Sequence, residues 1–358
     1  MADTLLYLGG YSTEAAAGLN VYRLDPGSGA LEHVQAVADV VNPSFLALGP
    51  QHRCLYAISE VADFGGSKSG GVAALEIDPG NGRLRLLNQQ SSVGTGPCHI
   101  DIDHDGRFVL VANYGGGSVA MLPIAADGSL EEASDFRQHA GSSVDPRRQT
   151  GPHAHSINVD PTNTFAFAPD LGLDKIMCYR VDHAALKLVA HKPSWVETPP
   201  GSGPRHMAFH PDGRHAYVVT EMGNTVLAYR FDAASGQLNP LQTVSTLPAA
   251  FTGTSYGADI HLSADGRFLY ASNRGHDSIA IFAVDPASGR LELKDTPTSG
   301  GEFPRNFGLD PQDRFLLSAN QNSDNVVVYR RDLDTGALDP TGHQIHAAKP
   351  VCVRVVEI

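Results

Sequence analysis

Short apolar stretches, each bounded by glycine, proline, aspartate or asparagine, follow one another along the chain. Residues 224–232, 277–285 and 325–332 are examples, and each ends in aspartate. Stretches of this length and composition are typical of β-strands. Hardly any segment keeps the 3.6-residue apolar period of an amphipathic helix. The pattern therefore predicts an all-β protein.

One unit of this pattern recurs six times. Its copies begin at the anchor residues Pro43, Pro97, Pro152, Pro204, Gly257 and Pro304, which lie 47 to 55 residues apart. Each copy has a first strand, a tight turn such as Asp212-Gly213, a second strand, a third strand, another turn and a fourth strand. Four antiparallel strands at this spacing are typical of a β-propeller blade.

The two ends of the chain supply one further unit. The opening "LLYLGGYS" and the following "GLNVYRLDPGSGALEHVQAV" give a second, third and fourth strand, and "PVCVRVVEI" at the C-terminus gives a first strand. An open solenoid would need polar caps, and this C-terminus is apolar. We therefore predict a single domain over residues 1–358. It is an all-β, seven-bladed β-propeller of four-stranded antiparallel blades, closed by the C-terminal strand joining three N-terminal strands.

The positions where chemistry can occur follow from this blade. A hairpin brings the start of its first strand and the end of its second strand to the same edge, so we expect these residues at one mouth of the propeller channel. The residues after the second strands are Tyr11, Glu60, Tyr114, Leu171, Glu221, Arg274 and Gln321. The apolar residues within the strands repeat from blade to blade, whereas the residues that follow the second strands differ in chemical type. This contrast is expected when a pseudo-symmetric scaffold carries one asymmetric site.

Two arginines at the predicted mouth are the strongest candidates. Arg205 follows an anchor and Arg274 follows a second strand, and either guanidinium suits an anion or an oxyanion. Glu221 occupies the slot of Arg274 one blade earlier; it could act as a general acid or base, or only as a salt-bridge partner. Arg305 follows an anchor as Arg205 does, and is the cation available for a phosphate group.

Histidines form the second group of candidates. His153 and His155 are two residues apart and so face the same side of a strand, as a catalytic pair, as hydrogen-bonding groups or as metal ligands. H-x-H without a clustered carboxylate is weak evidence for a metal, and we expect none. His206 and Asp259 are expected either to orient other groups at the site or to have purely structural roles.

Three other positions have simpler interpretations. Asn273 is counted with the substrate-binding candidates, although Asn113 and Asn320 recur in equivalent positions and favour a strand-end cap. His210 and His215 are expected to be solvated or structural. No P-loop, dinucleotide fingerprint or G-x-S-x-G motif is present, and a cysteine nucleophile is left open only by Cys98 beside His99.

Composition narrows the class of partner. The net charge is −13, which argues against a nucleic-acid or anionic membrane surface, so any cationic site must be local. No apolar run approaches the roughly 20 residues of a membrane span. The opening "MADTLLYLGGYS" carries an aspartate where a signal peptide carries basic residues, and the four cysteines are far apart. These features predict a cytoplasmic protein with free thiols.

Four segments carry a family resemblance: "GPHAHS", "GPRHMAFHPDGRHAYVVTE", "GADIHLSADGRFLYASNRG" and "FPRNFGLDPQDRFLLSANQ". They resemble the seven-bladed propeller lactonase family of bacterial cycloisomerase-type 6-phosphogluconolactonases, which also includes fungal 3-carboxy-cis,cis-muconate lactonizing enzymes. The resemblance covers essentially the whole chain. It implies a cleft without metal or cofactor in which His155, with His153 as its ambiguous neighbour, acts with Arg205, Glu221 and Arg274.

The resemblance implies hydrolysis of a sugar-acid lactone, 6-phosphogluconolactone or a related aldonolactone. His155 or Glu221 would take the proton of the attacking water, and the two arginines would stabilise the oxyanion. The alternatives are a muconate-type lactonizing cyclase and a non-enzymatic ligand-binding propeller. We expect a small-molecule sugar lactone as partner, no nucleic acid, no membrane, and a monomer or weak homodimer.

Overall fold

The computed structural model describes residues 3–12 and 18–358. Met1 and Ala2, part of the opening segment used to predict localisation, lie outside the described residues. The chain forms two compact units, one built mainly of residues 205–357 and the other of residues 34–204. We call them the C-terminal unit and the central unit. No helix in the described ranges is long and apolar enough to cross a membrane.

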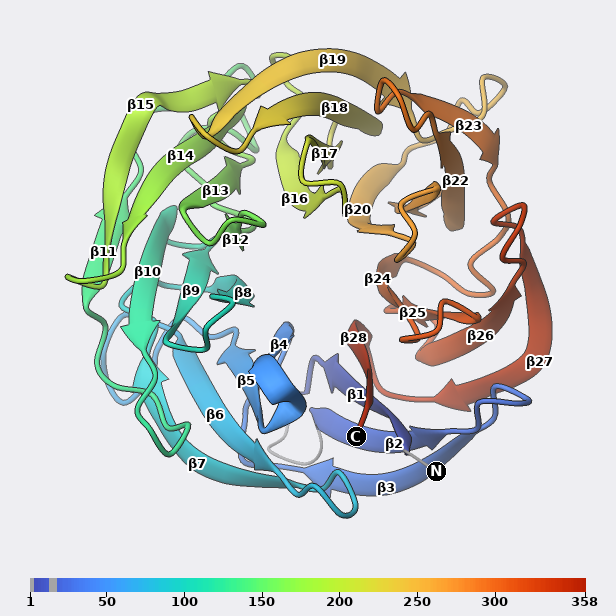
Figure 1. Cartoon of the computed structure of the whole chain (residues 1–358), viewed down its shortest axis with the longest axis horizontal. Coiled ribbons are helices and arrows are strands. Elements are labelled where there is room, and N and C mark those ends of the chain that lie inside the picture. Colours follow the sequence, from blue (N-terminus) through green and yellow to red (C-terminus); the bar gives the residue numbers. More distant parts are fainter. Residues whose placement is uncertain (1–2, 13–17) are drawn as a thin grey trace. The chain divides into compact units, whose positions relative to one another are not determined.

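The C-terminal unit contains three complete four-stranded sheets, in the orders β16-β17-β18-β19, β20-β21-β22-β23 and β24-β25-β26-β27. Neighbouring strands along the chain lie side by side in each sheet (Figure 1). The strands are β16 (Pro204–Phe209), β17 (His215–Thr220), β18 (Thr225–Asp232), β19 (Gln237–Ser245), β20 (Tyr256–Leu262), β21 (Phe268–Arg274), β22 (Ser278–Val284), β23 (Leu291–Asp295), β24 (Pro304–Leu309), β25 (Phe315–Asn320), β26 (Asn325–Arg331) and β27 (Leu338–His346).

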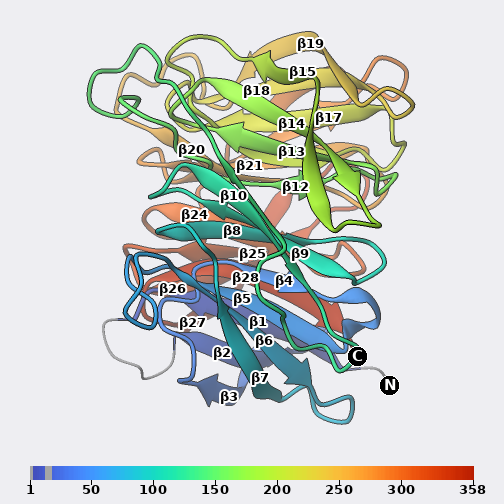
Figure 2. The same cartoon turned by 90° about the vertical axis from the view of Figure 1, so that its left-hand side faces the viewer.

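The central unit contains three more sheets of the same kind, ordered β4-β5-β6-β7, β8-β9-β10-β11 and β12-β13-β14-β15. Figure 2 shows the last of these from the side. The elements are β4 (Leu46–Leu48), the 3-10 helix η1 (Pro50–His52), β5 (Cys54–Ser59), β6 (Gly71–Ile77), β7 (Leu84–Ser91), β8 (Pro97–Ile102), β9 (Phe108–Asn113), β10 (Ser118–Pro123), β11 (Asp135–Gln138), β12 (Asn158–Val159), β13 (Phe165–Asp170), β14 (Lys175–Asp182) and β15 (Lys187–Glu197).

The seventh sheet joins the two ends of the chain. Its order is β28-β1-β2-β3, formed by β28 (Pro350–Glu357), β1 (Thr4–Gly10), β2 (Leu19–Leu24) and β3 (Leu31–Val37). The C-terminal strand therefore supplies the first strand of a blade whose other three strands come from the N-terminus, and β28 lies beside β1 (Figure 1). The predicted seven-bladed β-propeller is confirmed.

The strand ends fall where the repeat places them. Six second strands end at Gly10, Ser59, Asn113, Asp170, Thr220 and Asn320, each one residue before its candidate position. β21 is one residue longer and includes Arg274 itself. In the first hairpin of the C-terminal unit, Arg205 near the start of β16 and Glu221 just past β17 therefore share one edge.

The first strand of one blade is interrupted. β12 covers only two residues, and the preceding "GPHAHS" segment is extended without a continuous ladder. A bridge between Ala154 and Asp170 and the bond from the His155 N–H to the Pro169 carbonyl, at 2.9 Å, fasten it to the end of β13. The histidine pair thus lies on a loop-like segment held at single points.

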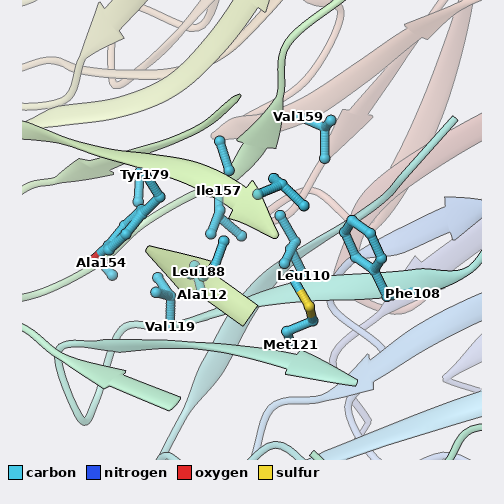
Figure 3. Close-up of a cluster of buried hydrophobic side chains, with 13 residues drawn as sticks. Phe108, Leu110, Ala112, Val119, Met121, Ala154, Ile157, Val159, Tyr179 and Leu188 are labelled. Atoms are coloured by element: carbon cyan, nitrogen blue, oxygen red, sulfur yellow. The ribbon is translucent and has the colours of Figure 1, made fainter. Parts of the chain in front are cut away.

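Apolar side chains from neighbouring sheets meet between the blades. In the central unit, alternate residues of β9 (Phe108, Leu110 and Ala112) point into a cluster with Ile157 and Tyr179 from the next sheet (Figure 3). The strand period of two puts every second side chain on this face. Each large side chain buried in this way contributes about 1.5–3 kcal/mol. Packing of this kind fixes the strands whose ends carry the polar residues.

Candidate active site

Two buried arginines in the C-terminal unit share one carboxylate. Arg205 donates from Nε to Glu221 Oε2 over 3.1 Å, and Arg274 Nη2 lies 2.8 Å from the same oxygen. The three side chains are 1%, 5% and 6% exposed, for Arg205, Arg274 and Glu221 respectively. We call these three residues the arginine cluster. The ion-pair role that the sequence left open for Glu221 is present.

Backbone carbonyls of β20 hold the same two guanidinium groups. Arg205 Nη1 donates to the Ala258 carbonyl at 2.5 Å, and Arg274 Nη2 donates to the Gly257 carbonyl at 2.9 Å. The N–H of Gly257 in turn donates to the Glu221 carbonyl at 3.0 Å. A proline has no N–H to donate. This bond explains why the anchor of this blade is not proline, and the Thr220 carbonyl oxygen, 2.4 Å from the place of a Cβ, explains why it is glycine.

His206 and Asp259 support Arg205 from behind. His206 Nδ1 lies 2.7 Å from Asp259 Oδ1, and Arg205 Nη1 donates to His206 Nε2 at 3.1 Å. Asp259 also accepts from His261 Nε2 at 2.8 Å and from the Asn306 amide. His206 must carry its proton on Nδ1 to make both contacts. These are the contacts of a pair that orients Arg205.

The pKa values of this pair follow from burial and charge. Burial, then the charge of Arg205, lowers the pKa of His206 to about 3, although Asp259 opposes the shift. Burial alone would raise the pKa of Asp259, but His261 and His206 hold it well below its usual value. The pair is therefore a neutral imidazole bonded to a carboxylate.

The cluster has an excess of positive charge. Burial, followed by the charges of Arg274 and Arg305, lowers the pKa of Arg205 to about 9 against the opposing effect of Glu221 and Asp259. Three cations thus face two carboxylates within one electrostatic neighbourhood. Arg305 is partly buried, and its charge acts on Arg205 and also on His206. The arrangement favours an anionic ligand or an oxygen that becomes negative.

The histidine pair lies in the central unit, where both rings contact Tyr114. His153 stacks on the Tyr114 ring at 4.5 Å between centroids and donates from Nδ1 to its carbonyl at 2.9 Å. His155 is 4% exposed and meets the same ring edge-on at 5.2 Å. The Cys98 thiol is buried and donates to the His155 carbonyl at 3.3 Å. The same thiol lies 3.7 Å from His155 Nδ1.

Asn273 makes the contacts of a strand-end cap. Its amide donates to the Thr246 carbonyl at 2.9 Å and to Ser278 Oγ at 3.1 Å. Asn113 makes the equivalent bonds in its own blade, and Asn320 donates to the Ser299 carbonyl at 3.0 Å. A contact repeated in three blades belongs to the blade. We therefore assign Asn273 to the cap and not to substrate.

A buried network behind the histidine pair was missed from the sequence. His139 Nδ1 lies 2.6 Å from Asp170 Oδ2, and His139 Nε2 lies 2.8 Å from the Tyr179 hydroxyl. The other oxygen of Asp170 accepts the His153 N–H at 2.8 Å. The sequence offers one indication of this network, because Asp170 is charged whereas the equivalent residues at the ends of the other second strands are Gly, Ser, Thr or Asn. The sequence offers no such indication for His139, because this residue lies in a connecting segment outside the repeated strands.

Polar groups gathered at the strand ends of a propeller are typical of propellers that bind or convert a small molecule. The chain belongs to the lactonase family: the model described as "Lactonase, 7-bladed beta-propeller" matches residues 5–355. The family predicted from the sequence is confirmed.

Several relatives are similar over their full length. A 6-phosphogluconolactonase of Bacillus subtilis is 38% identical over 355 residues, covering 99% of each chain. A 6-phosphogluconolactonase of Formosa agariphila is 36% identical over 338 residues, covering 93% of this chain and 94% of its own. The solved structure of a periplasmic gluconolactonase from Pseudomonas aeruginosa is 39% identical, with a TM-score of 0.93 and 99% of each chain covered.

Proposed function

We propose that this protein hydrolyses a sugar-acid lactone, 6-phosphogluconolactone or a related aldonolactone. The observation that carries the proposal is the buried arginine cluster, together with full-length similarity to a 6-phosphogluconolactonase and a gluconolactonase. Both relatives are named for opening a lactone ring. They differ in whether the name includes a phosphate, so the proposal covers both substrates.

The chemistry needs a stabilised oxyanion. Water adds to the lactone carbonyl, the carbonyl oxygen becomes negative, and the ring C–O bond then breaks to give a carboxylate and a hydroxyl group. Donors directed at such an oxygen each contribute about 3 kcal/mol to transition-state stabilisation. Arg205 and Arg274 supply permanent cations whose positions are fixed by Glu221 and β20 before substrate arrives.

The proton-transfer group follows from the family resemblance and from the bonding of Glu221. A carboxylate oxygen that accepts two charge-assisted hydrogen bonds is a poor acceptor for a further proton. We therefore assign Glu221 to positioning the arginines. The family resemblance implies His155 as the group that removes the proton of water. A His155→Gln variant should then lose turnover while its free energy of unfolding changes little.

The activity is tested by a panel of sugar lactones, with and without phosphate, followed by acid release in a pH-stat with a chelator present. We expect acid release well above spontaneous hydrolysis. Arg274→Ala should lower kcat by roughly 10²–10³-fold if it serves the oxyanion. Arg85→Ala is the matched control, because Arg85 is 69% exposed and pairs only with Glu76 among the ion pairs in the described parts of the chain.

The outcomes separate the alternatives. Full turnover by Arg274→Ala would remove the proposed role of that arginine. Acid release from no lactone in the panel would overturn the hydrolase assignment in favour of a lactonizing cyclase or a binding propeller.

A further inference from the structure

The turn between β16 and β17 brings together three side chains that can bind a metal ion. His210, Asp212 and His215 each offer one donor atom, and these three atoms all lie within 4.8 Å of one another. The side chains are 12%, 17% and 8% exposed, respectively. The group is therefore largely enclosed by the fold but reachable from solvent.

The distances within this group suit a transition metal. Asp212 places one carboxylate oxygen 3.0 Å from His210 Nδ1 and the other 2.9 Å from His215 Nδ1. Zinc binds imidazole nitrogen and carboxylate oxygen at about 2.0–2.2 Å, which puts neighbouring donors roughly 3–3.4 Å apart. Two of the three distances between donor atoms are thus close to those of a metal site before any ion binds.

The protonation of His210 points to a cation. Its Nε2 lies 3.0 Å from the Gly266 carbonyl, so this nitrogen carries the proton. Its Nδ1 accepts the Asp212 N–H at 3.1 Å, so this nitrogen is unprotonated, and a metal ion would take the place of that N–H at its one lone pair. That lone pair lies 3.0 Å from an Asp212 carboxylate oxygen, which is also an acceptor. A bound cation would relieve this contact, and a carbonyl on the far nitrogen is the usual support for a metal-binding histidine.

Both histidines depart from the repeat. The other five hairpins have the sequences "GPQHRC", "DHDGRF", "DPTNTF", "SADGRF" and "DPQDRF" where this one has "HPDGRH". In four of them a side-chain oxygen of the first residue accepts the N–H of the sixth, as Ser263 Oγ does with Phe268 at 3.0 Å, whereas "GPQHRC" begins with glycine. Phe268, Phe315 and Cys54 at the sixth position lie beside Gly336, Gly29 and Gly128, and His215 lies beside Gly289 in the same way. The other blades have Gly, Asp or Ser at the first position and Cys or Phe at the sixth, so the hairpin does not require histidine at either position.

We propose that the β16–β17 turn binds one divalent transition metal ion of the zinc type through His210, Asp212 and His215, with water completing its coordination. His215 would bind through Nδ1 and hold its proton on Nε2. This revises the expectation that both histidines are solvated or structural. The turn lies at the opposite end of these strands from Arg205 and Glu221, about five residues or roughly 17 Å away. The ion therefore fastens the hairpin and takes no part in lactone hydrolysis.

The test uses tag-free, chelator-stripped protein titrated with zinc by calorimetry and with cobalt by visible absorption. We expect one ion per chain and a cobalt spectrum of a nitrogen–oxygen site. The matched control is the double variant His210→Ser, His215→Phe, which gives this turn the first and sixth residues of the "SADGRF" hairpin. Its folding is checked by circular dichroism and by lactonase turnover, which should equal that of the wild type.

The variant should lose the ion and the associated stabilisation. Zinc at about 100 times its Kd should raise the wild-type Tm by roughly 3–4 °C and leave the variant unchanged. Asp212→Asn serves as a second variant if the double variant folds poorly, and it should weaken binding at least tenfold. Equal uptake by wild type and variants, or uptake of less than one ion per chain at saturating zinc, would overturn the proposal. The zinc, cobalt, circular dichroism and Tm measurements do not depend on whether the protein hydrolyses lactones.

Discussion

Replacing Glu221 with glutamine removes one negative charge from a side chain that two buried guanidinium groups share. The two bonds are 3.1 and 2.8 Å long, from Arg205 Nε and Arg274 Nη2. Glutamine keeps an oxygen at this place, so each contact changes from an ion pair to a bond between a guanidinium and a neutral amide oxygen, a loss of about 1–1.5 kcal/mol per bond. The free energy of unfolding should fall by about 2–3 kcal/mol.

This loss corresponds to a modest shift in Tm. At about 2.1 cal/mol/K per residue, a chain of 358 residues has an unfolding entropy near 0.75 kcal/mol/K. The Tm should therefore fall by roughly 3–4 °C. Glu76→Gln is the matched control, because Glu76 pairs with Arg85 at 2.6 Å but is 50% exposed. An exposed pair of this kind contributes about 0–1 kcal/mol.

Denaturant unfolding and calorimetry of both variants measure the difference, and lactone turnover of Glu221→Gln tests its role. A positioning role predicts partial activity, because one oxygen still meets both arginines. A general base at this position would cost about 10²–10⁴-fold in kcat. Unfolding free energies that fall equally in the two variants would refute the argument from buried charge.

Two further predictions concern the same unit. The unfolded chain binds a proton on His206 near pH 6.5 but the folded chain only near pH 3, because burial lowers its pKa. The free energy of unfolding should therefore decrease as the pH falls from about 6.5 to about 3, and this decrease should be smaller in the His206→Gln variant. Denaturant titrations at several pH values measure it, and an equal dependence on pH in both proteins would contradict the prediction. Gly257→Ala should lower the unfolding free energy by about 1–3 kcal/mol, because its Cβ would lie 2.4 Å from the Thr220 carbonyl oxygen. An unchanged denaturation midpoint would contradict this prediction, because it would show that the backbone at residue 257 moves to accommodate the Cβ without loss of stability.

The repeat explains why so much of the fold could be predicted. Tight turns and alternating strands recur with one period, so the ends of β5, β9 and β17 could be placed to the residue. The candidate positions at those ends follow directly from antiparallel pairing. Arg205, Glu221 and Arg274 could therefore be selected together, although 69 residues separate the first from the last.

The roles of these side chains depend on contacts that no periodicity encodes. Glu221 bonds both arginines only because β20 brings Arg274 to the end of β17. The bond between His139 and Asp170 joins a connecting segment to a strand end, so spacing along the chain gives no hint of it. The use of His206 to hold Arg205 likewise depends on which nitrogen carries the proton, and Asp259 decides that.

The pairing of β28 with β1 has a consequence for how the protein is made. Ribosomes add about 5–20 residues per second, so strand β28 follows strand β1 by roughly 20–70 s. Throughout that interval the apolar strand β1 has one unpaired edge, the kind of edge to which other chains add. The nascent protein is therefore most exposed to misassembly at its N-terminal strand, and the last eight-residue strand ends that exposure.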